Sequence, residues 1–224
     1  MSAVRAVVFD IDDTLYLERD YVRSGFASLS TYAEERWGIA NFGERAWQLF
    51  LLGARGDIFN RVLIDCGVAA GGADVRALVD RYRAHTPDIT LLPDARAALE
   101  ALHGRFQLAA ITDGPLASQQ AKARALGLEQ WLEPIVFTAA LGPNAGKPAL
   151  DAFQLVEKRL GVSGTECVYV ADNPQKDFIA PHELGWRTVR VRRPGGLHHE
   201  LESAADVRHE LVDLREPAST LAPL

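Results

Sequence analysis

The chain has 224 residues, of which 48% are hydrophobic and 24% charged, a composition typical of an ordinary soluble protein with a full core. A net charge of −6 argues against nucleic-acid binding, which needs a basic face opposite the phosphates, and no apolar run is long enough to span a membrane. No signal-peptide pattern opens the chain, so we expect a cytoplasmic protein. Cys66 and Cys167 form no CxxC pair, which favours free buried thiols over a disulfide or a zinc site.

The first predicted element is a buried strand from Val4 to Phe9, apolar and largely β-branched except for Arg5. The acidic stretch Asp10-Ile11-Asp12-Asp13-Thr14 follows it directly. Two carboxylates two residues apart at a strand end repel each other unless a cation lies between them, and oxygen-rich clusters of this kind suit Mg²⁺. The alternative is a strand that ends in a polar turn with a helix cap.

A region with helical periodicity comes next, from about Glu18 to His85. Breaks at Trp37-Gly38, Gly53–Gly56 and Cys66–Gly72 divide it into about four helices. Because the region has no strand pattern, we expect residues 17–88 to form a small all-helical domain. It would be inserted into a core domain made of residues 1–16 and 89–224.

Strands and helices alternate in the rest of the chain. The further predicted strands are Phe106–Thr112, Ile135–Phe137, Cys167–Ala171 and Thr188–Val191, and Leu201–Leu214 is a candidate for an edge strand. The predicted helices are Pro93–Leu102, Leu116–Leu126 and Ala149–Leu160, and Pro174–Leu184 is predicted to form a turn followed by a helix. Alternation at this spacing indicates right-handed crossovers and a doubly wound, Rossmann-like parallel sheet, which makes the fold class α/β. The tail from Glu216 carries little signal and is expected to be peripheral.

Polar residues follow several of these strands. Since the carboxyl ends of parallel strands lie on one edge of the sheet, where open α/β sheets bind ligands, we expect these residues to meet in one cleft. They are Asp10, Asp12, Thr112, Lys147, Asp172 and Asp177. Each one alone has a common structural explanation, such as a helix cap or a solvated surface charge. Because all six occur together at or after the predicted strand ends, a purely structural explanation for the whole set is improbable.

Four motifs resemble those of the haloacid dehalogenase-like hydrolases. They are D-I-D-D-T at Asp10–Thr14, I-T-D-G at Ile111–Gly114, G-K-P at Gly146–Pro148 and A-D-N-P-x-x-D at Ala171–Asp177. All four occur in the right order and at the right strand ends, and the resemblance covers the chain from about residue 4 to 195. The helical block falls between the first two motifs, where this family places a mobile cap.

The resemblance implies a Mg²⁺-dependent phosphomonoester hydrolase that forms an aspartyl-phosphate intermediate. Asp10 would be the nucleophile, and Asp12 would protonate the leaving group and later activate water. Mg²⁺ would be held by the Asp10 carboxylate, the Asp12 backbone carbonyl and Asp172. Asp177 would steady the waters of the metal or position Lys147.

The second and third motifs would bind the phosphoryl group. Thr112 and the N–H of Asp113 would contact its oxygens, with Gly114 in the same strand-to-helix turn. Lys147 would add a positive charge that stabilises both the nucleophile and the transferring group.

Arginines of the helical block are candidates for contact with the leaving group, Arg23 and Arg55 first, although each is also explained as an exposed helix residue. The other two candidates there are Arg19 and Arg61. The basic stretch Arg190–Gly196 lies on the predicted active-site edge. It would contact an anionic substrate or form a basic turn without a ligand.

Other activities stay open. Dehalogenases of the family lack the second aspartate, so Asp12 argues against dehalogenation. A phosphomutase, a phosphatase of nucleoside monophosphates, and a catalytically silent binding protein on the same fold remain alternatives.

The D-N-P-Q-K-D-F and R-P-G-G stretches look like those of sugar-phosphate and acylneuraminate-phosphate phosphatases, which favours a small phosphorylated metabolite such as a sugar phosphate. We expect a monomer or homodimer with no nucleic-acid or membrane partner.

Overall fold

The computed structural model describes residues 3–203, 207 and 209–215. The tail from Glu216 therefore lies outside the described residues. The chain divides into two compact units, one made of Met1–Arg19 with Thr90–Leu224 and the other of Asp20–Ile89. None of the helices within the described ranges has the length and apolar character needed to cross a bilayer.

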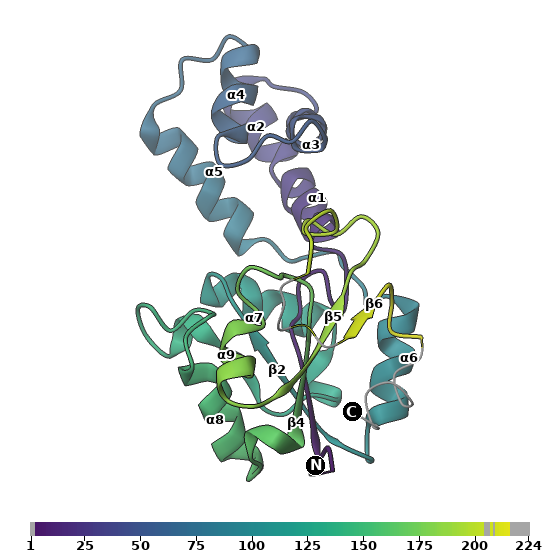
Figure 1. Cartoon of the computed structure of the whole chain (residues 1–224). Coiled ribbons are helices and arrows are strands. Elements are labelled where there is room, and N and C mark those ends of the chain that lie inside the picture. The colour runs from purple at the N-terminus through teal and green to yellow at the C-terminus, as the bar shows by residue number, and fades with distance from the viewer. Residues whose placement is uncertain (1–2, 204–206, 208, 216–224) are drawn as a thin grey trace. The chain divides into compact units, whose positions relative to one another are not determined.

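The first unit is built on a six-stranded parallel sheet with strand order β3-β2-β1-β4-β5-β6, shown in Figure 1. The strands are β1 (Ala6–Phe9), β2 (Gln107–Thr112), β3 (Ile135–Phe137), β4 (Cys167–Ala171), β5 (Arg187–Val191) and β6 (His209–Leu211). The predicted doubly wound α/β fold is confirmed, and β6 lies inside the segment proposed for an edge strand. β1 is central, because Val8 is opposite Ala109 of β2 and Tyr169 of β4.

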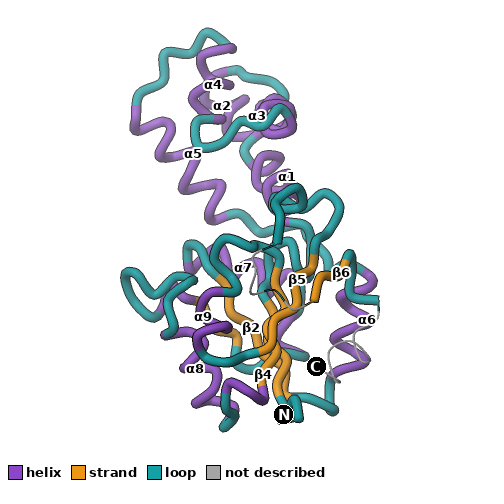
Figure 2. The backbone as a smooth tube through the Cα atoms, viewed as in Figure 1, coloured by secondary structure: helices purple, strands orange, loops and turns teal. Residues whose placement is uncertain are grey.

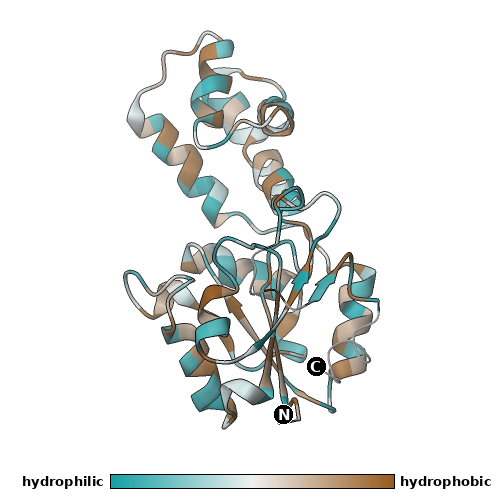
Figure 3. Ribbon diagram, viewed as in Figure 1, coloured by the Kyte–Doolittle hydropathy of each residue, from teal (hydrophilic) through white to brown (hydrophobic). Residues whose placement is uncertain are grey.

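Helices cover both faces of this sheet. In Figure 2 the strands run between α8 (Asp151–Leu160) and α9 (Ile179–Glu183) on one side and α6 (Pro93–Leu102) on the other. The helix α7 (Leu116–Ala125) connects β2 to β3. Short 3₁₀ turns lie at Leu128–Gln130, Thr138–Ala140 and Gly164–Glu166. Figure 3 shows β2 and β4 mainly in the hydrophobic colour, as expected for strands buried on both faces, whereas β6 and the end of β5 are in the hydrophilic colour.

One buried cluster joins β1, β2 and β4 to α8 and α9. Phe153 of α8 makes edge-to-face contacts there, with ring centroids 5.1 Å from Tyr169 and 5.4 Å from Trp186. Edge-to-face pairs of this kind add about 0.5–1.5 kcal/mol to the effect of burial alone. Tyr169 is therefore held firmly while its hydroxyl group points to the polar edge described below.

The second unit contains five helices, where the sequence pattern predicted about four. They are α1 (Glu18–Ser28), which begins in the first unit, α2 (Ser30–Trp37), α3 (Phe42–Leu51), α4 (Ile58–Asp65) and α5 (Gly72–Ala84). The prediction missed the break at Leu29. There the Ser28 hydroxyl donates to the Gly25 carbonyl at 2.7 Å, and the Leu29 N–H bonds to Phe26 instead. Serine competes with the helix for its carbonyl and ends α1.

Both cysteines are free, as predicted. Cys167 is buried in β4, whereas Cys66, at the end of α4, is only half-buried, so the expectation of two buried thiols was wrong for Cys66. Position explains the difference. A residue in a central strand is covered on both faces, while a residue just after a helix is covered on one side.

Candidate active site

The carboxyl edge of the sheet brings three acidic side chains together. Asp10 follows β1, Asp172 follows β4, and Asp177 lies in the turn before α9. Each offers an oxygen atom, these atoms lie within 4.8 Å of one another, and all three residues are buried. Buried carboxylates this close repel one another, and an oxygen-only donor set is what Mg²⁺ prefers. The cluster therefore fits a divalent cation.

Lys147 partly neutralises this cluster. Its ammonium group lies 2.8 Å from Asp10, 2.7 Å from Asp177 and 3.1 Å from the Tyr169 hydroxyl, and its side chain is 1% exposed. Burial opposes the charge of Lys147, but Asp10 and Asp177 outweigh this effect and raise its pKa well above the ordinary value. Burial, together with Asp177 and Asp172, still raises the pKa of Asp10 well above normal, against the influence of Lys147. The site keeps an excess of negative charge that a bound cation would offset.

Asp177 is fixed by a compact turn. A turn followed by a helix was predicted over Pro174–Leu184, and the helix of the structure begins at Ile179. Before it, the Asn173 side chain accepts a hydrogen bond from the Gln175 N–H at 2.9 Å, and the Asp177 carboxylate accepts one from the Asn173 N–H at 3.0 Å. Such side-chain bonds replace helical ones and favour turns.

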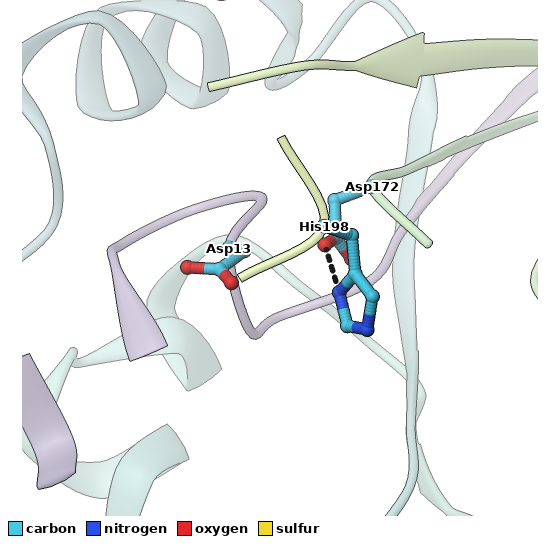
Figure 4. A group of neighbouring side chains, drawn as sticks. All are labelled: Asp13, Asp172 and His198. Carbon is cyan, nitrogen blue, oxygen red and sulfur yellow. Dashed lines mark hydrogen bonds and ion pairs between the residues drawn. The ribbon is translucent and has the colours of Figure 1, made fainter. Parts of the chain in front are cut away.

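A second group combines Asp13, Asp172 and His198, which Figure 4 shows side by side. His198 Nδ1 lies 3.0 Å from Asp172, and this hydrogen bond raises the pKa of His198. Burial raises the pKa of Asp172, and His198 opposes the rise. Asp13 accepts hydrogen bonds from the N–H groups of Glu18 at 2.8 Å and Leu197 at 2.7 Å, yet burial raises its pKa to about 6. The sequence carried no signal for His198, because it lies in a loop.

The Asp12 carboxylate has a different set of partners. It accepts hydrogen bonds from the Tyr16 hydroxyl, from Gln119 at 2.9 Å, and from Lys122 at 2.7 and 2.9 Å. Burial alone would raise the pKa of Asp12, but contact with Lys122 and these hydrogen bonds lower it. Gln119 and Lys122 belong to α7 and are buried. Sequence reasoning did not single out either of them.

The residues of the second motif take defined places. Thr112 donates its hydroxyl proton to Gln119 at 3.0 Å. The Asp113 carboxylate accepts from the Lys147 N–H at 3.1 Å and forms an ion pair with Lys176 at 2.7 Å, so it anchors the loop that carries Lys147. Burial opposes the charge of Asp113, but the two lysines lower its pKa. Gly114 has a φ of 127°, which L side chains rarely adopt.

The basic stretch Arg190–Gly196, which begins within β5, makes contacts that stabilise the surrounding backbone. Arg190 is fully buried and donates to the carbonyls of Asp172 at 2.9 Å and His198 at 2.8 Å. Arg193 donates to the carbonyl of Thr14 and pairs with Asp94, both at 2.8 Å. Because these arginines are engaged with backbone carbonyls and with Asp94, the contacts favour the alternative of a basic turn without a ligand.

The two leading cap candidates make contacts within the helical unit. The Arg23 guanidinium carbon lies 5.7 Å from the ring centroid of Trp47. That of Arg55 lies 3.9 Å from the ring centroid of Phe50, and Arg55 also donates to the Phe50 carbonyl at 2.9 Å. Both arginines therefore cover aromatic surface, as long basic side chains often do.

Comparisons with known proteins identify the family of this chain. Residues 4–185 match a family model described as haloacid dehalogenase-like hydrolase. The chain is 29% identical to a glyceraldehyde 3-phosphate phosphatase of Methanopyrus kandleri, over 91% of this chain and 89% of the relative. It is 28% identical to a ribulose-1,5-bisphosphate 5-phosphatase of Halopiger xanaduensis, over 82% and 83%. A magnesium-bound hydrolase from Bacillus subtilis has the same fold, with a TM-score of 0.69 at 20% identity, over 98% of this chain and 99% of that one. This chain belongs to the haloacid dehalogenase-like hydrolase family.

Proposed function

We propose that this hydrolase is a Mg²⁺-dependent phosphatase that cleaves a small phosphomonoester through an aspartyl-phosphate on Asp10. The observation that carries the proposal is the buried arrangement around Asp10. One of its oxygens is held by Lys147 at 2.8 Å, and two further carboxylates lie within 4.8 Å. A carboxylate held by a lysine and placed beside a cation site is positioned to attack phosphorus.

Asp10 and Asp172 would hold the metal, with the Asp12 backbone carbonyl as a further oxygen ligand. When bound, Mg²⁺ neutralises the oxygens of the phosphoryl group and allows two anions to approach each other. Asp177 pairs with Lys147 at 2.7 Å, so its role is to orient that lysine. Lys147 and Thr112 would contact phosphoryl oxygens, which requires the Thr112 hydroxyl to leave Gln119.

The chemistry then needs two proton transfers at Asp12. In the first step Asp10 forms a bond to phosphorus, and the ester oxygen leaves with a proton from Asp12. Asp12 must therefore take up a proton before this step, against the influence of Lys122, which lowers its pKa. In the second step water attacks the same phosphorus and gives a proton to Asp12, and the bond to Asp10 breaks. Phosphate leaves, and both aspartates return to their starting states.

The names of the relatives support a sugar phosphate as the substrate class, since those two act on glyceraldehyde 3-phosphate and ribulose-1,5-bisphosphate. The helical unit would act as the cap that selects the leaving group. Arg55→Ala should then lower kcat/KM for a sugar phosphate more than for acetyl phosphate, whose small leaving group makes few remote contacts. We place the enzyme in the cytoplasm, as a monomer or homodimer.

A panel of phosphomonoesters tests the proposal. Phosphate release from sugar phosphates, nucleoside monophosphates, phosphoserine and 4-nitrophenyl phosphate is measured with Mg²⁺ and with excess chelator. We expect Mg²⁺-dependent release, strongest on a sugar phosphate and lost in Asp10→Asn. Full activity in chelator, or an Asp10→Asn variant within about tenfold of wild type, would contradict the proposed reaction.

A further inference from the structure

The Asp12 carboxylate is held by one face of α7. Gln119 and Lys122 lie three residues apart, so their side chains project from the same side of that helix. Lys122 contacts both carboxylate oxygens, at 2.7 and 2.9 Å, and Gln119 contacts one at 2.9 Å. The Lys122 side chain is 3% exposed. A lysine this deeply buried needs a fixed anionic partner, because an unpaired buried charge is very costly.

Until a phosphoryl group takes over the Thr112 hydroxyl, the orientation of Gln119 is set as well. The Thr112 hydroxyl donates to Oε1 of Gln119 at 3.0 Å, which leaves Nε2 to donate to Asp12. Gly114 makes room for this amide, since a Cβ atom there would lie only 2.9 Å from Nε2 of Gln119. Tyr16, which lies four residues after Asp12, donates a further hydrogen bond to the Asp12 carboxylate.

Asp10 and Asp12 of the first motif thus each pair with a buried lysine of their own. Lys147 pairs with Asp10 at 2.8 Å, and Lys122 pairs with Asp12 at 2.7 Å. Without Lys122, the Asp12 carboxylate would lose its charged partner. It could then turn toward the nearby cation site, where it could not exchange protons with the leaving group.

We propose that Lys122, assisted by Gln119, is a positioning residue that keeps the Asp12 carboxylate at the place from which it exchanges protons with leaving group and water. The proposal rests on the proposed phosphatase function. The proposal gives two residues of α7 a role in the reaction, although this helix lies outside the four sequence motifs. Lys122 acts on the reaction only through Asp12.

Kinetics of Lys122→Met, Lys122→Arg and Lys158→Met test this role. Lys158 is exposed on α8 and provides the matched control. We expect Lys122→Met to lower kcat on the best alkyl phosphate of the panel on the order of 100-fold, with a smaller loss on 4-nitrophenyl phosphate. KM should change less than about threefold, because substrate binding is not affected. Lys122→Arg should recover about tenfold in kcat because it restores the cation, and Lys158→Met should equal wild type.

A double-mutant cycle separates positioning from a general folding defect. On 4-nitrophenyl phosphate, Lys122→Met added to Asp12→Asn should lower kcat by no more than about twofold, because the group it positions is already gone. If Lys122→Met is poorly folded by circular dichroism, Gln119→Leu gives the same test with a smaller expected loss, about tenfold.

Three outcomes would overturn the proposal. It is overturned if Lys122→Met keeps kcat within about threefold of wild type, or if its loss multiplies fully with that of Asp12→Asn. It is also overturned if alkyl and aryl phosphates lose equally. A wild-type enzyme that releases phosphate from no ester of the panel would instead refute the phosphatase function itself, before any variant is made.

Discussion

Replacing Lys147 by methionine would expose the charge imbalance of the active site. The ammonium group lies 2.8 Å from Asp10 and 2.7 Å from Asp177, in a side chain that is 1% exposed. Methionine keeps a long flexible chain but removes the charge, so two buried carboxylates lose their partner. Breaking a buried ion pair in this way costs about 3–5 kcal/mol. Since 1 kcal/mol lowers the Tm of a domain of this size by roughly 2–4 °C, the metal-free variant should melt roughly 6–20 °C below wild type.

This loss of stability should depend on pH. Burial, Asp177 and Asp172 raise the pKa of Asp10 in the folded protein, and Lys147 opposes the rise. Without Lys147 the pKa of Asp10 rises further, so the folded variant binds a proton that the unfolded chain has lost. Stability then falls as pH increases, and the difference from wild type should be larger at about pH 8 than at about pH 5. Mg²⁺ should restore part of the loss.

Urea unfolding followed by circular dichroism, in chelator and at both pH values, measures the effect. Lys176→Met is the control, because Lys176 pairs with Asp113 at 2.7 Å but is 36% exposed. An ion pair with that exposure contributes below about 1 kcal/mol. If Lys147→Met is as stable as Lys176→Met, or if its loss is the same at both pH values, the electrostatic reasoning is wrong.

Further predictions concern the acid, the metal and the thiols. Asp12→Asn should lose about 100-fold or more in kcat on alkyl phosphates and less on 4-nitrophenyl phosphate, and equal losses would argue against an acid role. The Mg²⁺ concentration for half activity should rise as pH falls, because burial and neighbouring carboxylates raise the pKa values of Asp10 and Asp172 and protons compete with the metal. A pH-independent value between about pH 8 and pH 6 would contradict this competition. Burial raises the pKa of Cys167 to about 12, so a thiol reagent should label Cys66 in the native protein and Cys167 only in denaturant. Fast labelling of both cysteines in the native protein would contradict the burial of Cys167.

The sheet and its polar edge were predictable because parallel strands buried on both faces appear as continuous apolar runs. The strand expected at Cys167–Ala171 has those bounds in the structure. The meeting of Asp10 and Asp172 then follows from topology alone, since neighbouring parallel strands end on the same side. No contact between side chains had to be known for that part of the site.

The supporting residues were not predictable in the same way. A lysine such as Lys122 on a short helix has the same sequence pattern whether it points to solvent or to a buried carboxylate. His198 lies in a loop, where no periodicity indicates which way a side chain points. Helix ends also escaped prediction where side chains compete for backbone groups, as Ser28 does at the end of α1. Each of these features depends on contacts between distant or irregular segments.

The covalent bond between Asp10 and phosphorus is the step on which the proposed reaction depends, and it can be trapped. Asp12→Asn should still be phosphorylated by 4-nitrophenyl phosphate and Mg²⁺, since that leaving group needs little protonation, but should hydrolyse the intermediate slowly. Borohydride reduces an aspartyl-phosphate to homoserine, which peptide mass spectrometry locates in the sequence. We predict homoserine at position 10, absent when Asp10 is also changed to Asn. Release of 4-nitrophenol with no homoserine at position 10, or with homoserine at another aspartate, would contradict Asp10 as the nucleophile.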